Sequence, residues 1–125
     1  MLKNIILKIY FKFCKLFKKN DFHSLSLEEF HAVFCIRNNR WKKIRDSYIE
    51  NNNACAVCGS KENLAVHHKI PVHVDKSQEL NENNFIVLCQ NKTMNCHFVF
   101  GHLMNWTKYN PNVVQDAKTW NEKLK

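Results

Sequence analysis

The sequence predicts a small α+β protein in which two short strands and a helix surround a metal site. Two cysteine pairs have the spacing of zinc ligands, and two apolar segments between the pairs have the length of short strands. With 125 residues, the chain allows one small domain with an appendage, and a bound zinc ion would help so small a core to fold. We expect a basic amphipathic helix over residues 1–20 and one domain over residues 21–125, with its core at about 51–106.

The chain is basic, with 19 lysine and arginine residues against 11 acidic residues and a formal net charge of +8. This excess favours a polyanionic partner, nucleic acid first and an anionic membrane surface second. Residues 1–20 scatter lysines among apolar residues and lack a small-residue cleavage site, so a cleavable signal peptide is not expected. We therefore expect a reducing compartment, the cytoplasm, in which Cys14 and Cys35 are small buried side chains.

Residues 1–20 have helical periodicity and contain no apolar run of about 18 residues, so a membrane-spanning helix is not expected. The basic stripe of this helix comprises Lys8, Lys12, Lys15 and Lys19. Its apolar face has three interpretations: docking on the domain or on a second subunit, lying in a membrane surface, or belonging to a basic arm that follows DNA. The sequence leaves the three open.

Two further helices are expected before the cysteines. Ser26-Leu27-Glu28-Glu29 has the pattern of a capping box, which predicts a helix beginning there. A second helix is expected from about Arg40 to Glu50, with inward side chains at Trp41, Ile44 and Tyr48.

The elements that follow alternate between strand and helix patterns. Residues 64–66 and 85–88 are expected to be short strands, and the pattern from Cys96 through Trp106 is helical. Asn110-Pro111 is typical of a helix N-cap followed by proline at the first helical position, so a last helix is expected there. The expected core is therefore two strands followed by a helix around a metal.

The cysteine spacing predicts a structural zinc site. Cys55-x2-Cys58 is typical of one zinc knuckle, and Cys89-x6-Cys96 gives a second pair with a wider gap than usual. Four thiolates would close a tetrahedral zinc site. Two alternatives remain, namely that one or two of these cysteines only pack in the core, or that His97 replaces Cys96 as the fourth ligand.

The adjacent residues His67 and His68 are the strongest candidates for chemistry. Adjacent residues on a strand point to opposite faces, so one imidazole can bind a metal while the other addresses a water molecule or packs behind it. With the thiols closing one site, imidazoles remain for a second, open metal site. A closed site beside an open one on a basic chain favours a metal-dependent nuclease.

These motifs together resemble the HNH endonuclease family, whose fold is the ββα-metal motif. The resemblance covers about residues 40–112, with a signature from Cys55 to His102. Four motifs occur in the family's order: Cys55-Ala-Val-Cys58-Gly59, Val66-His67-His68-x-x-Pro71, Asn84-x3-Leu88-Cys89, and Cys96-His97 with His102. The segment from Phe100 to Asn110 is similar to the ending of small HNH proteins common in bacteriophages, so the expected cytoplasm is a host's if a phage encodes the chain. The implied fold is an α+β ββα-metal core with a four-cysteine zinc site, flanked by N- and C-terminal helices.

The resemblance implies a role for each site residue. His67 and His102 would bind the catalytic Mg²⁺ or Mn²⁺, and His68 would be the general base. Asn84 would hold the loop of the base and orient His68. The four cysteines would bind the structural Zn²⁺. The implied reaction is hydrolysis of double-stranded DNA to 5′-phosphate and 3′-hydroxyl ends, with no small-molecule cofactor.

His97 departs from a simple arrangement. It lies five positions before His102, about 140° away on a regular α-helix. Either a π-bulge or a late helix start brings the two rings together, or His102 alone binds the metal with His67. We favour His102 alone and keep His97 as a third ligand in question. His73 lies near the expected site but is expected to be an ordinary loop histidine.

Two other functions compete with the nuclease hypothesis. One is a non-catalytic, zinc-stabilised module that binds nucleic acid through its basic surface. The other is a membrane-associated or toxin-like nuclease, whose residues 1–20 engage a bilayer or an inhibitor. DNA cleavage assays with and without a chelator distinguish the first alternative from a nuclease. Liposome binding and solubility after deletion of residues 1–20 test the second alternative.

Overall fold

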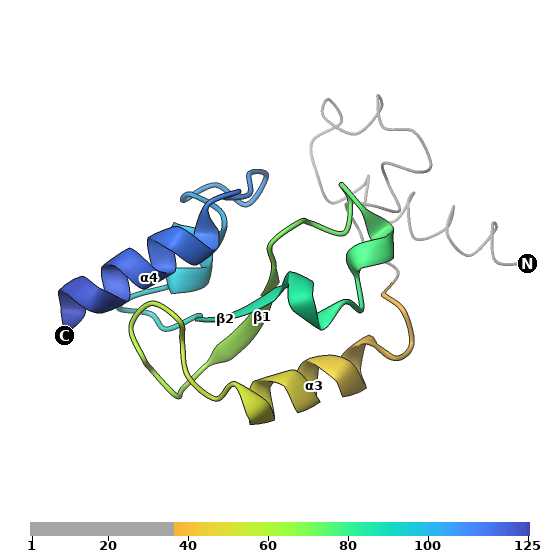
Figure 1. Ribbon diagram of the computed structural model, residues 1–125, viewed down its shortest axis with the longest axis horizontal. Helices are drawn as coiled ribbons and strands as arrows, with labels where there is room; N and C mark the ends of the chain where they lie inside the picture. The colour runs from red at the N-terminus through yellow and green to blue at the C-terminus, as the bar shows by residue number, and fades with distance from the viewer. Residues whose placement is uncertain (1–36) are drawn as a thin grey trace, which may run out of the picture.

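The computed structural model describes residues 37–125. The expected helices at 1–20 and after Ser26, together with Cys14, Cys35, His23 and His31, lie outside the described residues. Within the described part, the elements in chain order are α3 (Trp41–Asn51), β1 (Leu64–His68), η1 (Lys76–Gln78), η2 (Glu82–Asn84), β2 (Phe85–Cys89), η3 (His97–Gly101) and α4 (Val113–Leu124). Figure 1 shows β1 and β2 between α3 and α4. The predicted α+β class with paired strands is confirmed.

The strands β1 and β2 pair antiparallel with a register that separates the two adjacent histidines. His67 lies opposite Ile86, and His68 lies opposite Phe85. Because side chains alternate along a strand, these two pairs face opposite sides of the sheet. The amide of Lys69 also donates to the carbonyl of Asn84 at 2.8 Å, which extends the pairing beyond the end of β1.

One face of the sheet packs against α3. Trp41, Val66 and Phe85 form a buried cluster with the partly buried Ile44 and Tyr48 around it. The Tyr48 hydroxyl also donates to the carbonyl of Phe85 at 3.2 Å. The helix runs from Trp41 to Asn51, within one residue of the predicted 40–50, and its predicted inward residues are the ones that contact the sheet.

A second apolar cluster lies on the side of α4. It combines Leu88 of β2, Phe100 of η3, and Val113 and Ala117 of α4 with buried cysteines. Leu88 is fully buried, as are Cys89 and Cys96. Apolar packing and the cysteine cluster therefore share one side of the molecule.

The predicted helix from Cys96 through Trp106 was wrong in length and in type. The structure has a five-residue π-helical turn, η3, which ends at Gly101. Leu103 and Met104 then adopt positive φ values of 52° and 61°, which cannot continue a right-handed helix. The amide of Met104 donates to the carbonyl of Phe98 at 3.0 Å and closes the turn.

The last helix begins later than predicted. Pro111 lies in a turn, and α4 starts at Val113. Asn110 still serves the helix start, because its Oδ1 accepts from the amide of Asn112 at 2.9 Å. Its side-chain amide donates to the carbonyl of Phe100 and to Asp116, so it also ties η3 to α4.

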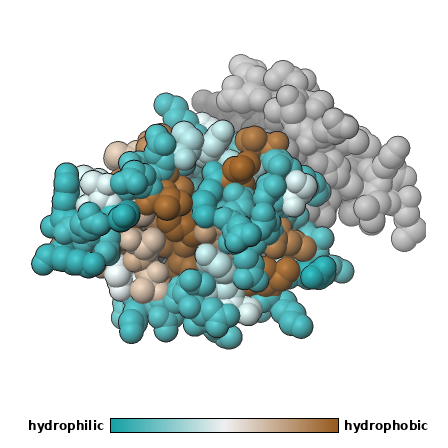
Figure 2. Space-filling model, in the orientation of Figure 1, coloured by the Kyte–Doolittle hydropathy of each residue, from teal (hydrophilic) through white to brown (hydrophobic). Residues whose placement is uncertain are grey.

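The surface of the described part is mixed in polarity. Figure 2 shows apolar side chains gathered in patches between hydrophilic ones on the face in view. Among residues 37–125, no helix combines the length and apolar content that a membrane crossing requires.

Leu88 tests the packing on the α4 side. We expect Leu88→Ala to lower the free energy of unfolding by about 2–5 kcal/mol, because a fully buried side chain leaves a cavity. Val114→Ala on the exposed face of α4 is the matched control, with an expected change within about 0.5 kcal/mol. Urea unfolding of the metal-loaded protein measures both. Equal losses of unfolding free energy in the two variants would show that Leu88 is not a core side chain.

Candidate functional site

Four cysteines converge from three segments of the chain. The Sγ atoms of Cys55, Cys58, Cys89 and Cys96 lie within 4.8 Å of one another. The Sγ atoms of Cys58 and Cys89 are 3.6 Å apart. Zinc–sulfur bonds of about 2.3 Å in a tetrahedron place the sulfurs about 3.8 Å apart, so this spacing fits a zinc ion and not a disulfide. The four cysteines can therefore bind zinc.

The backbone around the first pair forms a tight knuckle. Gly59 adopts a φ of 74°, which favours glycine, and its amide donates to the carbonyl of Cys55. The amide of Ala56 donates to the carbonyl of Val87 and fixes the knuckle to β2.

The thiols differ in acidity. Burial raises the pKa of Cys58. Burial acts in the same direction on Cys89, but the backbone amides of Cys96 and Asn91 outweigh it and lower its pKa to about 7. A thiol that ionises near neutral pH is a ready zinc ligand, because zinc binds the thiolate.

Three histidines form a second cluster. His67 comes from β1, His97 begins η3, and His102 follows η3 directly. Their ligand nitrogens lie within 4.8 Å of one another, and their ring centroids are 5.0–5.1 Å apart. The π-helical turn explains the spacing, because i→i+5 hydrogen bonding brings residues five apart to the same face. The sequence analysis favoured His67 and His102 alone and kept a π-helical turn that adds His97 as the alternative. The structure has this alternative arrangement.

His97 therefore groups with the histidines, whereas Cys96 groups with the cysteines. The two neighbours point into different clusters. His97 is not in the position of a fourth zinc ligand.

The histidine cluster fits a cation. The Nε2 atom of His67 is buried and has no hydrogen-bond partner, a costly situation that a bound ion would relieve. Burial, with the nearby His97 and His102, lowers the pKa of His67 to about 3. Burial and His102 lower the pKa of His97 to about 4. Both rings are therefore neutral near pH 7, with lone pairs free for a metal.

Groups behind the rings orient two of these histidines. Nδ1 of His102 lies 2.7 Å from the carbonyl oxygen of Lys108. A carbonyl only accepts, so Nδ1 carries the proton and Nε2 keeps its lone pair for an ion. Nδ1 of His97 lies 2.9 Å from the side-chain carboxamide of Gln90, the residue after β2. For Nε2 of His97 to keep its lone pair for an ion, this carboxamide must present its oxygen to the proton on Nδ1.

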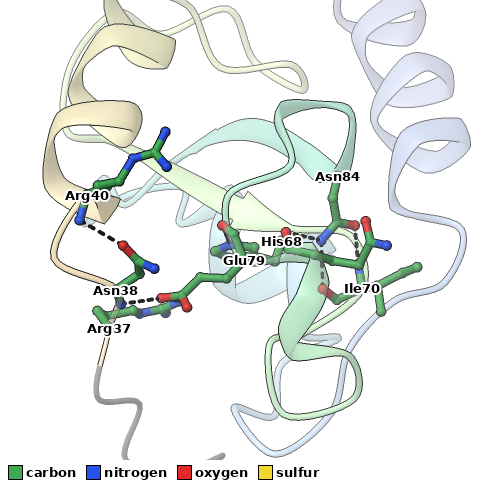
Figure 3. Close-up of polar contacts among 8 residues, drawn as sticks. Arg37, Asn38, Arg40, His68, Ile70, Glu79 and Asn84 are labelled. Carbon is green, nitrogen blue, oxygen red and sulfur yellow. Dashed lines mark hydrogen bonds and ion pairs between the residues drawn. The ribbon is translucent and has the colours of Figure 1, made fainter.

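His68 occupies the opposite face of β1. Its ring stacks on Trp41 at a centroid distance of 4.7 Å and meets the edge of Phe85 at 5.1 Å. Its Nε2 lies 2.8 Å from the carbonyl oxygen of Glu79, as Figure 3 shows. Burial lowers the pKa of His68, an effect that the Glu79 carbonyl partly opposes.

Asn84 fixes the chain just beyond His68. Its Oδ1 accepts from the amide of Ile70 at 2.8 Å, and its Nδ2 donates to the carbonyl of Ile70 at 2.9 Å (Figure 3). Asn84 is buried at the end of η2, directly before β2. Its bonds go to the loop after β1, two residues beyond the histidine, and not to the His68 ring.

Glu79 and Arg37 have no motif that would have predicted them. The carboxylate of Glu79 is buried and accepts from the amide of Asn38 at 3.0 Å, with Arg37 at 4.0 Å. The guanidinium of Arg37 lies 5.0 Å from the centre of the Trp41 ring. Figure 3 shows that this network anchors the residue whose carbonyl holds His68.

One cavity of about 350 Å³ joins these groups. His67, His68, His97 and His102 all line it, and no aspartate or glutamate among the described residues does. Its remaining walls include His73, Arg37, Trp106, Thr107 and Lys108. Apolar walls come from Val66, Pro71 and Val72, and the charged side chains of the lining are all cationic, a setting that favours an anionic ligand.

Cys58→Ser tests the cysteine cluster. We expect the variant to lose its tightly bound zinc and much of its thermal stability, because a structural zinc contributes directly to folding. His102→Ala is the control and is expected to keep the zinc. Metal content after dialysis and circular dichroism measure the two effects. Zinc loss from His102→Ala alone would mean that the two clusters are wrongly assigned.

Gly101→Ala tests the histidine cluster without removing a ligand. The added Cβ would lie 2.9 Å from Nδ1 of His67 and 3.2 Å from Cδ2 of His97, so both rings must shift. We expect the affinity for Mn²⁺ to fall about 10- to 100-fold, with the zinc content unchanged. Gly59→Ala is the control. Its Cβ meets open space, and its φ of 74° is expected to cost about 1–2 kcal/mol of stability but no Mn²⁺ affinity. Isothermal titration calorimetry decides, and unchanged affinity in Gly101→Ala would contradict the arrangement.

Comparison with known proteins supports the resemblance. Residues 55–97 match the family model described as HNH endonuclease, and this match spans the cysteine cluster, both strands and His97. No curated protein and no solved structure matches the chain significantly. HNH domains generally belong to nucleases that use divalent metals. Residues 55–97 of the chain therefore form an HNH endonuclease-like region.

Proposed function

We propose that this protein is a metal-dependent DNA endonuclease, which hydrolyses phosphodiester bonds to 5′-phosphate and 3′-hydroxyl ends. The observation that carries the proposal is the setting of His68. Its Nε2 is fixed by the Glu79 carbonyl, and His68 lines the same cavity as His67, His97 and His102.

His68 has the tautomer of a general base. Because a carbonyl oxygen only accepts hydrogen bonds, the Nε2 atom of His68 carries the proton that reaches Glu79. In the neutral ring, Nδ1 then holds the lone pair. The lowered pKa, caused chiefly by burial, keeps the ring in this base form at neutral pH.

The proposed step is hydrolysis with His68 as proton acceptor. Nδ1 takes a proton from water while the water oxygen forms a bond to phosphorus. The bond between phosphorus and the 3′ oxygen breaks, and that oxygen leaves with a proton from solvent. His68 returns its proton to solvent. The Glu79 carbonyl stabilises the transient imidazolium, since it accepts from Nε2 throughout.

His67, His97 and His102 would hold the catalytic ion. When bound, a divalent ion supplies positive charge to the phosphate and to the leaving oxygen. The donor set is three imidazoles, with no carboxylate among the described residues of the cluster. Imidazole suits transition metals better than Mg²⁺, which prefers oxygen ligands. We therefore propose Mn²⁺ or a similar transition ion as the better activator, with Mg²⁺ weaker.

The charge of the cavity supports a nucleic-acid substrate. Arg37 and Lys108 line it beside the histidines, and the whole chain carries a formal charge of +8. Both side chains can meet phosphate oxygens. A non-catalytic nucleic-acid-binding module is the alternative. Purified, metal-loaded protein that cuts neither supercoiled, linear nor single-stranded DNA, with or without EDTA, would favour that module.

His68→Ala is the direct test of the base. We expect the cleavage rate to fall about 100- to 10,000-fold, because the proton acceptor is removed while the metal ligands remain. Zinc content and folding are expected to stay unchanged. The matched control is His73→Ala, an exposed histidine of the loop after β1, with a change in rate below about tenfold.

Rates come from plasmid nicking with saturating Mn²⁺. Full activity of His68→Ala would rule out the assigned base. An equal loss of cleavage rate in His73→Ala would indicate that His73, and not His68 alone, is needed as the general base. Loss of zinc from His68→Ala would show that the variant acts through folding.

A further inference from the structure

Trp106 is a large aromatic side chain at the edge of the cavity. It is 55% exposed, yet it lines the same cavity as the histidines. Its ring centroid lies 4.8 Å from that of His102, 5.4 Å from that of His97 and 4.9 Å from that of Phe98. The indole is therefore supported by the metal-ligand rings on one side and open to solvent elsewhere.

The loop that carries Trp106 is held by its own hydrogen bonds. The amide of Asn105 donates to the carbonyl of His102 at 3.0 Å, and that of Lys108 donates to the carbonyl of Asn105 at 2.9 Å. Oδ1 of Asn105 accepts from the amide of Thr107 at 3.0 Å and from its hydroxyl at 2.7 Å. The exposure of Trp106 thus belongs to an ordered turn.

The neighbours of Trp106 are also apolar and exposed. Leu103 and Met104 are both in the left-handed region, an uncommon conformation for residues other than glycine, and both side chains lie largely in solvent. Exposed apolar residues beside a cavity can contribute to a contact surface for its ligand. Lys108 lines the cavity beside this surface and offers a positive charge.

We propose that Trp106 is a stacking platform for an unstacked nucleobase of the substrate, next to the phosphate that is cleaved. The inference rests on the proposed nuclease function and specifies its substrate class. An indole stacks on any base, while a lysine and an arginine in the same cavity meet the phosphates. Bases in an intact duplex are stacked on each other and unavailable. The enzyme therefore prefers single-stranded or distorted DNA over regular duplex.

The experiment measures base-dependent binding. It uses the full chain in a His68→Ala background with Mn²⁺, so that the DNA stays intact. The probes are a fluorescent single-stranded oligonucleotide and an oligonucleotide of the same length built from abasic sugars, which keeps every phosphate. We expect Trp106→Ala to weaken binding of the normal strand about 5- to 150-fold and binding of the abasic strand less than about twofold.

Two further variants keep the test independent of folding. Trp106→Phe retains an aromatic face and is expected to keep most of the preference for the normal strand. Trp106→Leu fills similar space without an aromatic face and is expected to lose it. Trp120→Ala is the matched control, because Trp120 on α4 is 45% exposed but does not line the cavity.

Any of three results would overturn the proposal. Equal weakening on normal and abasic strands would mean that Trp106 only supports the histidines. No weakening on either strand, or a Leu variant equal to Phe, would mean that this surface meets something other than a base, such as a protein. If the wild-type protein binds the normal strand more tightly than the abasic strand but never cuts DNA, the nuclease function is wrong. The role of Trp106 as a stacking platform would still hold.

Discussion

The alternation of side chains along β1 is the constraint on which the site depends. Adjacent imidazoles could compete for one ion, but the two-residue period of a strand sends His67 and His68 to opposite faces of the sheet. His67 then meets His97 and His102, while His68 packs on Trp41 and bonds to a backbone carbonyl. One register shift would exchange both environments. The pairing of β1 with β2 therefore sets which histidine can bind metal and which can accept a proton.

The π-helical turn supplies the second half of the metal cluster. In a regular α-helix, residues five apart point in different directions, and His97 could not join His102. The wider turn aligns them, and Gly101 lets the His67 ring approach the backbone, since a Cβ there would lie 2.9 Å from its Nδ1. A π turn is less stable than an α turn, and such turns are frequent at functional sites. Here it brings His97 and His102 to the same side as His67.

The sequence predicted those features that depend on local pattern. Cysteine spacing, the paired strands and the inward face of α3 were all visible, because each has a characteristic period or motif. The sequence analysis named a π-bulge as one possibility but did not favour it. Its geometry depends on packing between η3 and β1, which the helical period of the sequence does not encode. The contribution of Glu79 was also invisible: its carbonyl holds His68, and any residue type has a carbonyl. Trp106 belonged to the segment that resembles the ending of small HNH proteins, but the sequence did not show that its ring would lie beside the histidines.

The cysteine cluster and the histidine cluster are coupled through the chain itself. Cys96 directly precedes His97, and Cys89 directly precedes Gln90. The side-chain carboxamide of Gln90 lies 2.9 Å from Nδ1 of His97. A zinc ion that gathers these two cysteines therefore also positions a histidine ligand and the group behind it. The apolar clusters around the sheet are small, so few other contacts could hold the start of η3 in place. A zinc ion bound by the four cysteines would thus also support the histidine cluster, because it would fix Cys96, the residue directly before the π turn that carries His97.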